Sequence, residues 1–180
     1  MESKGGSPTE YITQEEQNVL EALDSYGIRY VRLTHPAAVT MELCRGIGAS
    51  FGASHCKNLL LTNRSGKSFH LLLMEADKPY RTADVSRRLG VSRLSFASAD
   101  QLKEVMGLSP GCVSVMGLLN ECARSAYKNG FLHVAIDADL LKRQKLCVHP
   151  NVSTATLVVN TGDILRLLRS FGVEYKVIEV

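Results

Sequence analysis

Residues Lys57–Met74, KNLLLTNRSGKSFHLLLM, carry the strongest indication of the fold. Two apolar runs, 57–62 and 68–74, lie on either side of the turn-forming residues Asn63-Arg64-Ser65-Gly66. Apolar runs of this length, joined by a short polar segment with a glycine, are typical of two antiparallel strands. We therefore predict a β-hairpin whose middle is buried.

Outside this hairpin, helical and extended patterns alternate along the chain without internal repeats. We expect helices or helical turns at 15–26, 41–46, 83–89, 99–106, 138–143 and 163–170, with N-caps at Thr13, Thr40, Thr82, Ser98 and Thr161. We expect further strands at 29–33, 94–96, 112–116, 131–136, 154–159 and 173–178. Because some strands form hairpins and others alternate with helices, the pattern predicts an α+β fold with a mixed, mostly antiparallel sheet flanked by helices.

Length and composition are those of one globular domain. The chain has 180 residues, of which 45% are apolar and 22% charged. We expect residues 1–10 to form a flexible tail, because they are polar and rich in Gly and Ser, and residues 11–180 to form a single domain. No run of about 18 apolar residues is present, and the N-terminus lacks the apolar core of a signal peptide, so we expect a cytoplasmic protein with no membrane contact.

Charge and cysteine content narrow the classes of partner and site. The formal charge is only +3, so contact with nucleic acid is expected to be local, at a strand end, rather than along a duplex. The five cysteines are odd in number and contain no C-x-x-C pair, which favours reduced thiols. The five histidines have no second ligand at helical or hairpin spacing, so we expect no metal and no cofactor.

Two ionisable side chains stand where predicted strands begin or end. His149 precedes Pro150, which restricts its backbone to extended conformations, and is followed by the hydrogen-bonding side chains of Asn151, Ser153, Thr154 and Thr156. Lys57 opens an apolar strand, and Gly111 follows a proline. These residues predict a pocket at one edge of the sheet. Each also has a plain structural interpretation: an ordinary His-Pro turn, an edge-strand lysine that prevents aggregation, and a turn glycine.

Several short sequence motifs, in order along the chain, resemble those of a known family. They are His35-Pro36-Ala37 with Thr40, Lys57-Asn58-Leu59, Leu94-Ser95-Phe96-Ala97-Ser98, Gly107-Leu108-Ser109-Pro110-Gly111-Cys112-Val113-Ser114, Gly117-Leu118 with Asn120, and His149-Pro150-Asn151 with Thr154-Ala155-Thr156. With them the chain resembles the prolyl-tRNA editing-domain (YbaK-like) superfamily, most closely its freestanding alanyl-tRNA(Pro) deacylases, from about residue 11 to 173. The resemblance implies hydrolysis of the ester between an amino acid and the 3′ end of a misacylated tRNA, with a prolyl-tRNA synthetase as a further partner.

The resemblance also implies roles for single residues. Lys57 is expected to contact the terminal adenosine or its phosphate, and His149 to shape the aminoacyl pocket rather than act as a general base. The backbone of Gly111 would hold the 2′-OH or the ester carbonyl, while Asn58 and Asn120 would line the site. The substrate's own 2′-OH and an ordered water would carry much of the chemistry, which suits a sequence without an obvious activated nucleophile.

Three positions depart from the family pattern. Val115 stands where a proline is usual, Glu121 where an aspartate is usual, and Ser153 where an asparagine is usual. Such changes alter pocket size or polarity, and one methylene in an apolar pocket changes discrimination by only about 1–3 kcal/mol. Two alternatives therefore stay open: a deacylase for another misacylated tRNA, such as cysteinyl- or seryl-tRNA, and a non-catalytic module that binds tRNA ends or an amino acid. The oligomeric state is not predicted.

Overall fold

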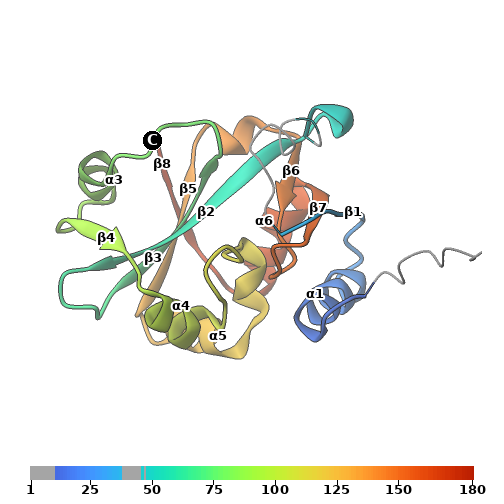
Figure 1. Cartoon of the computed structure of the whole chain (residues 1–180). Coiled ribbons are helices and arrows are strands. Elements are labelled where there is room, and N and C mark those ends of the chain that lie inside the picture. The colour runs from blue at the N-terminus through green and yellow to red at the C-terminus, as the bar shows by residue number, and fades with distance from the viewer. Residues whose placement is uncertain (1–10, 38–45, 47) are drawn as a thin grey trace, which may run out of the picture.

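The computed structural model describes residues 11–37, 46 and 48–180, arranged around one mixed sheet (Figure 1). The strands are β1 Tyr30–Thr34, β2 Ser54–Asn63, β3 Phe69–Glu75, β4 Leu94–Phe96, β5 Leu132–Asp137, β6 Lys145–Val148, β7 Ala155–Asn160 and β8 Tyr175–Ile178. The helices are α1 Gln14–Ser25, α3 Thr82–Leu89, α4 Ala99–Met106, α5 Glu121–Lys128 and α6 Thr161–Ser170, with 3₁₀ helices η1 Val115–Leu119 and η2 Leu140–Lys142.

The sheet has eight strands in the order β1-β7-β6-β2-β3-β5-β8, with β4 also paired to β2. Four pairings are antiparallel (β1–β7, β2–β3, β2–β4 and β6–β7) and three are parallel (β2–β6, β3–β5 and β5–β8). The predicted mixed, mostly antiparallel sheet flanked by helices is confirmed, and so is the central hairpin, now β2–β3.

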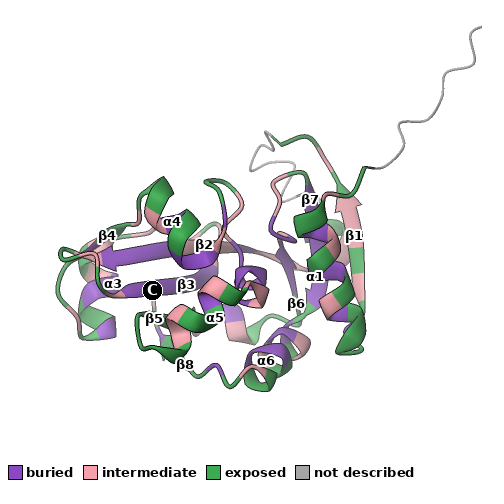
Figure 2. Cartoon of the chain, turned by 90° about the horizontal axis from the view of Figure 1, so that it is seen from below, coloured by how far each residue is buried: buried purple, intermediate pink, exposed green. Residues whose placement is uncertain are grey.

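The sheet is covered on both faces, which explains the continuous apolar runs in β2 and β3. Neighbouring residues enter opposite cores: Leu60 and Leu71 belong to the larger one, and Leu61 and Leu72 to the smaller. The larger core receives side chains from α1, α4, α5 and α6, whereas the smaller one is closed by α3. Figure 2 shows the buried sheet strands and the helices with one buried side. A strand that is buried on both faces does not alternate apolar and polar residues, so its sequence is a continuous apolar run.

Several predicted elements need correction. The segment 112–116 is not a strand: it is a loop that runs into η1, where the Ser114 hydroxyl accepts a hydrogen bond from Met116 N and starts a 3₁₀ turn. Thr82 and Thr161 do not cap their helices but are the first helical residues, and the capping positions Arg81 and Asn160 make no side-chain cap bond. The predicted caps at Thr13 and Ser98 are confirmed.

Among the elements given above, three were not predicted: α5, β6 and the 3₁₀ helix η1. The expected N-terminal tail, the cap at Thr40 and the helix at 41–46 (apart from Gly46) lie outside the described residues.

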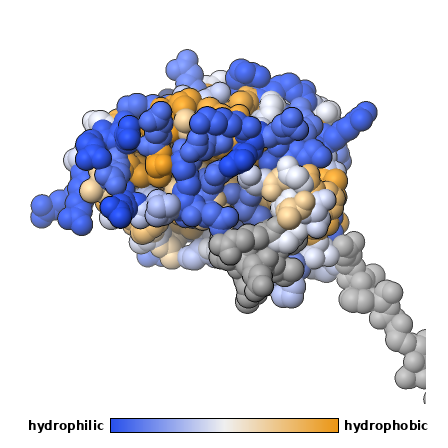
Figure 3. Space-filling view, turned by 90° about the horizontal axis from the view of Figure 1, so that it is seen from above, coloured by the Kyte–Doolittle hydropathy of each residue, from blue (hydrophilic) through white to orange (hydrophobic). Residues whose placement is uncertain are grey.

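The face of the molecule seen in Figure 3 is largely hydrophilic, with hydrophobic side chains gathered in separate patches. Within the described part of the chain, no helix has both the length and the hydropathy needed to cross a membrane.

Candidate functional site

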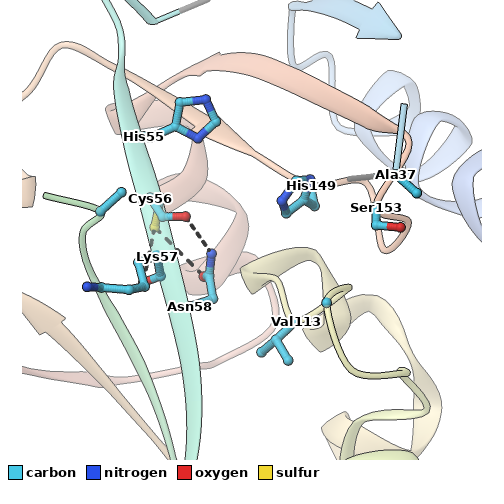
Figure 4. Close-up of a pocket in the computed structure, with 10 residues that line it drawn as sticks. Ala37, His55, Cys56, Lys57, Asn58, Val113, His149 and Ser153 are labelled. Carbon is cyan, nitrogen blue, oxygen red and sulfur yellow. Dashed lines mark hydrogen bonds between the residues drawn. The ribbon is translucent and has the colours of Figure 1, made fainter. Parts of the chain in front are cut away.

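A cavity of about 360 Å³ lies along the edge of β2 (Figure 4). β3 pairs with one side of β2 from Cys56 to Thr62, but on the other side β6 pairs only with Ser54 and His55, and β4 only from Leu61 onward. Among the described residues, 56–59 therefore meet no strand on that second side. We call the space beside this stretch the edge cavity. It is lined by Ala37, His55, Cys56, Lys57, Asn58, Ala76, Gly111, Val113, His149 and Ser153.

Parallel pairing brings His149 to this cavity. His55 in β2 lies opposite Cys147 in β6, and both strands run in the same direction. The chain that leaves β6 after Val148 therefore places His149 beside the part of β2 that continues through Lys57. Residues far apart in the sequence meet because one strand ends where its neighbour continues.

Asn58 links the loop before η1, which forms one wall of the cavity, to β2. Its Nδ2 donates to Cys56 O at 3.1 Å, and its Oδ1 accepts from Val115 N at 3.1 Å. The loop before η1 is held a second time, because the Ser114 hydroxyl donates to His149 O at 2.6 Å. These bonds satisfy polar groups at an open sheet edge that would otherwise have to be left to water. They also fix Gly111 and Val113 opposite β2.

The Val115 departure has a structural consequence at this point. A proline at position 115 has no N–H, so it could not make the bond to Asn58 Oδ1 that this chain makes. Val115 is itself buried, at 2% exposure, as the first residue of η1. In this chain the Asn58 amide is thus occupied in holding the loop.

His149 is fixed in orientation and in tautomer. Its Nδ1 lies 3.0 Å from Ala155 O, and because a carbonyl only accepts, Nδ1 carries the proton. Burial lowers the pKa of His149, the bond to Ala155 acts in the opposite direction, and the nearby His35 lowers the pKa further. A neutral ring then presents Nε2 as a hydrogen-bond acceptor.

The ring of His35 lies next to the ring of His149, and the two ring centroids are 6.3 Å apart. Its Nε2 is 2.9 Å from the Thr156 hydroxyl, and its backbone N–H donates to Thr154 O at 3.0 Å. Thr156 is buried and Thr154 is exposed, and neither lines the cavity. The Thr156 hydroxyl and the Thr154 carbonyl both contact His35, and a substrate-binding role of the two threonines stays a prediction.

Lys57 lines the cavity, and its ammonium group donates to Lys78 O at 2.9 Å. Figure 4 shows this side chain and the His149 ring pointing in different directions from β2 and the loop. Burial lowers the pKa of Lys57, while the carboxylate of Asp77 raises it. An ammonium group has three donors, so one bond to a carbonyl leaves others for an anionic or hydroxyl ligand.

The remaining predicted residues are placed differently. Gly111 lies at the cavity with φ +84°, a conformation that favours glycine, and Ser153 is also in the lining. Asn151 is buried with φ +61° and donates to Met116 O at 3.3 Å. Asn120 is outside the edge cavity: its amide donates to Met106 O at 2.8 Å, and it lines a separate hollow beside α1. The structure thus brings together Lys57, Asn58, Gly111, His149 and Ser153.

Among the described cysteines, Cys56 is the one that lines this cavity, and its thiol is poorly suited to act as a nucleophile. Burial raises the pKa of Cys56 to about 12, so its thiolate is scarce at neutral pH. None of the described cysteines, Cys56, Cys112, Cys122 and Cys147, forms a disulfide. No group of three or more His, Cys, Asp or Glu side chains suited to a metal ion occurs in the described part of the chain. The chemistry that these residues offer is positioning and polarisation by an ammonium, imidazoles and backbone N–H groups.

His55 is the lining residue that the sequence analysis missed as a candidate. A signal was present, because His55 lies only two residues before Lys57, at the entry to the same predicted strand. The convergence of His35, His55 and His149 was not visible, since it depends on the β6–β2 and β1–β7 pairings.

A known protein family and several known proteins are similar to this chain in sequence. Residues 35–167 match the model of the aminoacyl-tRNA editing domain. The chain is similar to the prolyl-tRNA editing protein ProX of Acetoanaerobium sticklandii, with 29% identity over 91% of this chain and 96% of that protein. It is also similar to the prolyl-tRNA synthetase associated domain-containing protein 1 of Xenopus laevis, with 26% identity over 87% of this chain and 91% of that protein.

A solved structure supports the fold. The structure of a putative trans-editing enzyme for prolyl tRNA synthetase superposes with a TM-score of 0.65, at 17% identity, over 94% of this chain and 99% of that one. At this identity the likeness concerns the fold alone. The family match covers most of the chain, from before the first cavity residue to beyond the last. The chain belongs to the aminoacyl-tRNA editing domain family, a family of aminoacyl-tRNA deacylases whose substrates are misacylated tRNAs.

Proposed function

We propose that this protein is a trans-editing hydrolase that removes a wrongly attached amino acid from tRNA, with alanyl-tRNA(Pro) as the preferred substrate. The observation that carries the proposal is the convergence of Lys57, Gly111 and His149 on one cavity, from three separate parts of the chain. The similarity to ProX and to the prolyl-tRNA synthetase associated domain-containing protein supports a substrate of the proline system, with a prolyl-tRNA synthetase as a further partner.

In this proposal each wall of the edge cavity has a role. The free N–H donors of Lys57 bind the terminal adenosine or its phosphate. The backbone beside Gly111 holds the 2′-OH or the ester carbonyl, where the absence of a side chain allows close approach. The fixed ring of His149 and the hydroxyl of Ser153 bound the aminoacyl group, and Asn58 keeps the loop in place.

Hydrolysis then needs little further machinery. An aminoacyl ester is already reactive, so orientation of a water and polarisation of the carbonyl are sufficient to speed its cleavage. The substrate's 2′-OH lies next to the ester and assists from within the substrate. The high pKa of Cys56 favours this route over a covalent thioester intermediate.

Small side chains in the lining support a small aminoacyl group. Ala37, Ala76 and Val113 form the apolar part of the cavity wall. Alanine suits such a wall, and cysteine and serine are close enough in size to be the alternatives. Discrimination among these groups is worth only about 1–3 kcal/mol in a pocket of this kind.

The proposal is tested by filling the cavity. Ala76→Leu adds bulk to the wall, and we expect it to slow release of alanine from alanyl-tRNA(Pro) by at least about tenfold relative to wild type. Ala83→Leu is the matched control, because Ala83 is exposed on α3 and outside the edge cavity, and its rate should equal that of wild type. Equal rates for wild type and Ala76→Leu would show that the ester is not bound here.

A non-catalytic role is the second candidate. It would be supported if the wild-type protein bound the tRNA acceptor end, with the salt sensitivity expected of phosphate contacts, but released no amino acid from any misacylated tRNA.

A further inference from the structure

His55 carries the clearest unmet hydrogen-bonding group in the edge cavity. Its Nε2 atom is buried and has no hydrogen-bond partner among the described residues. The same side chain lines the edge cavity and a second, more polar cavity of about 230 Å³ beside it. Buried polar atoms in folded proteins are nearly always paired, so an unpaired one in a side chain that lines a cavity can take its partner from a ligand or a water that enters there.

The state of the His55 ring decides what kind of group it can meet. Burial lowers the pKa of His55, the nearby His149 and His35 lower it further, and Asp77 acts in the opposite direction. The ring is therefore neutral at physiological pH and has one nitrogen that accepts a hydrogen bond.

Besides His55, the side chains of the edge cavity offer an N–H donor two acceptors, the His149 Nε2 and the Ser153 hydroxyl, and of the three atoms His55 Nε2 is the one buried without a partner. No carboxylate is among its lining residues. The Asn58 Oδ1 already accepts from Val115 N, and the His149 Nδ1 already donates to Ala155 O. An aminoacyl ester brings an α-amino group into this space, and that group has only donors when it is protonated.

From this geometry we propose that His55 binds the α-amino group of the aminoacyl ester, with the buried Nε2 accepting a hydrogen bond from it. The inference rests on the proposed function, since it names the part of the substrate that His55 recognises. His55 would make the enzyme selective for amino acids over other carboxylic esters of the same size.

The test compares two esters that differ only in the amino group, alanyl-tRNA(Pro) and propionyl-tRNA(Pro). For His55→Ala we expect kcat/KM to fall by about 10- to 100-fold on the alanyl ester, which is the range for loss of one hydrogen bond to a charged group. On the propionyl ester we expect a change of less than about threefold, because that ester has nothing for Nε2 to bind. The propionyl rate also reports whether the variant is folded.

Two further variants sharpen the test. His55→Gln keeps an acceptor near the position of Nε2, and we expect it to recover part of the alanyl rate. His133→Ala is the matched control, because His133 is exposed in a different cavity, and both rates should stay at wild-type levels.

The outcomes separate the two claims. Equal losses on both esters, or no loss on either, with an active wild-type enzyme, would overturn the role of His55 and leave the proposed function standing. A wild-type protein that hydrolyses neither ester would overturn the proposed function and, with it, this assignment.

Discussion

The ammonium group of Lys57 donates a hydrogen bond to the backbone carbonyl of Lys78 at 2.9 Å. Lys78 is in turn held by two carboxylates: its Nζ lies 2.8 Å from Asp137 Oδ2 and 2.7 Å from Asp139 Oδ2. Asp137 is fully buried at the end of β5. The position of the site lysine therefore depends on an ion-pair network on the far side of the β2–β3 hairpin.

This network gives the first prediction. Asp137→Asn keeps the size of the side chain but removes its charge from the part-buried pair with Lys78, and we expect the free energy of unfolding to fall by about 1–3 kcal/mol. We also expect a lower kcat/KM for ester hydrolysis, because the carbonyl that holds Lys57 becomes less fixed. Urea unfolding and steady-state kinetics measure the two effects.

The control is Asp163→Asn, which removes a more exposed ion pair with Arg166 and should change stability by less than about 1 kcal/mol. If both variants behaved alike, the network around Lys78 would have no special part in holding the site.

The second prediction concerns the loop at Gly111. At φ +84° an added Cβ would meet nothing within 4 Å, so Gly111→Ala costs backbone strain without a clash, about 1–2 kcal/mol. We expect hydrolysis to fall by more than stability explains, because the backbone N–H groups of the loop shift. Gly162→Ala, at an ordinary φ in α6, should be neutral or stabilising. A Gly111→Ala enzyme with wild-type kinetics would exclude the loop backbone from substrate binding.

The third prediction is a pH dependence of stability. The pKa of His70 is lowered to about 4, first by burial and then by the neighbouring His133 and Lys176. Between about pH 6.5 and pH 4, His70 is protonated in the unfolded chain but not in the folded one. The free energy of unfolding therefore falls as the pH falls through this window. His70→Phe does not titrate, and its free energy of unfolding should depend less steeply on pH than that of wild type.

Urea unfolding at several pH values between 7 and 4 gives both slopes. His55 and His149, whose pKa values are also lowered, keep part of the dependence in the variant. Identical slopes for wild type and His70→Phe would contradict the prediction.

The central hairpin and the caps at Thr13 and Ser98 could be predicted because their signals are local. Apolar runs around a polar turn and a capping residue before a helix act over a few residues. The segment 112–116 was wrongly predicted as a strand because the local pattern shows only that apolar residues are present. They are buried by a 3₁₀ turn that Ser114 starts, not by strand pairing. β6 has only four residues, and its pairing with β2 is long-range, so no local sequence pattern predicted this strand.

The same distinction applies to the site. Lys57, Gly111 and His149 could be singled out as residues at strand ends and turns, and the resemblance to editing domains connected them. The position of Asn120 outside the edge cavity could not be read from the sequence, because its bond to Met106 O depends on how α4 and η1 pack. The unpaired nitrogen of His55 is a property of the packed cavity and has no counterpart in the sequence.

The most direct test of the account is deacylation of alanyl-, cysteinyl-, seryl- and prolyl-tRNA(Pro) by wild type and by Lys57→Ala. We expect wild type to hydrolyse alanyl-tRNA(Pro) fastest and to spare prolyl-tRNA(Pro), and Lys57→Ala to lose most of this activity while staying folded. Lys67→Ala, in the exposed hairpin turn, should match wild type. Hydrolysis of alanyl-tRNA(Pro) by Lys57→Ala at the wild-type rate, or no hydrolysis of any ester by the folded wild-type protein, would contradict the account.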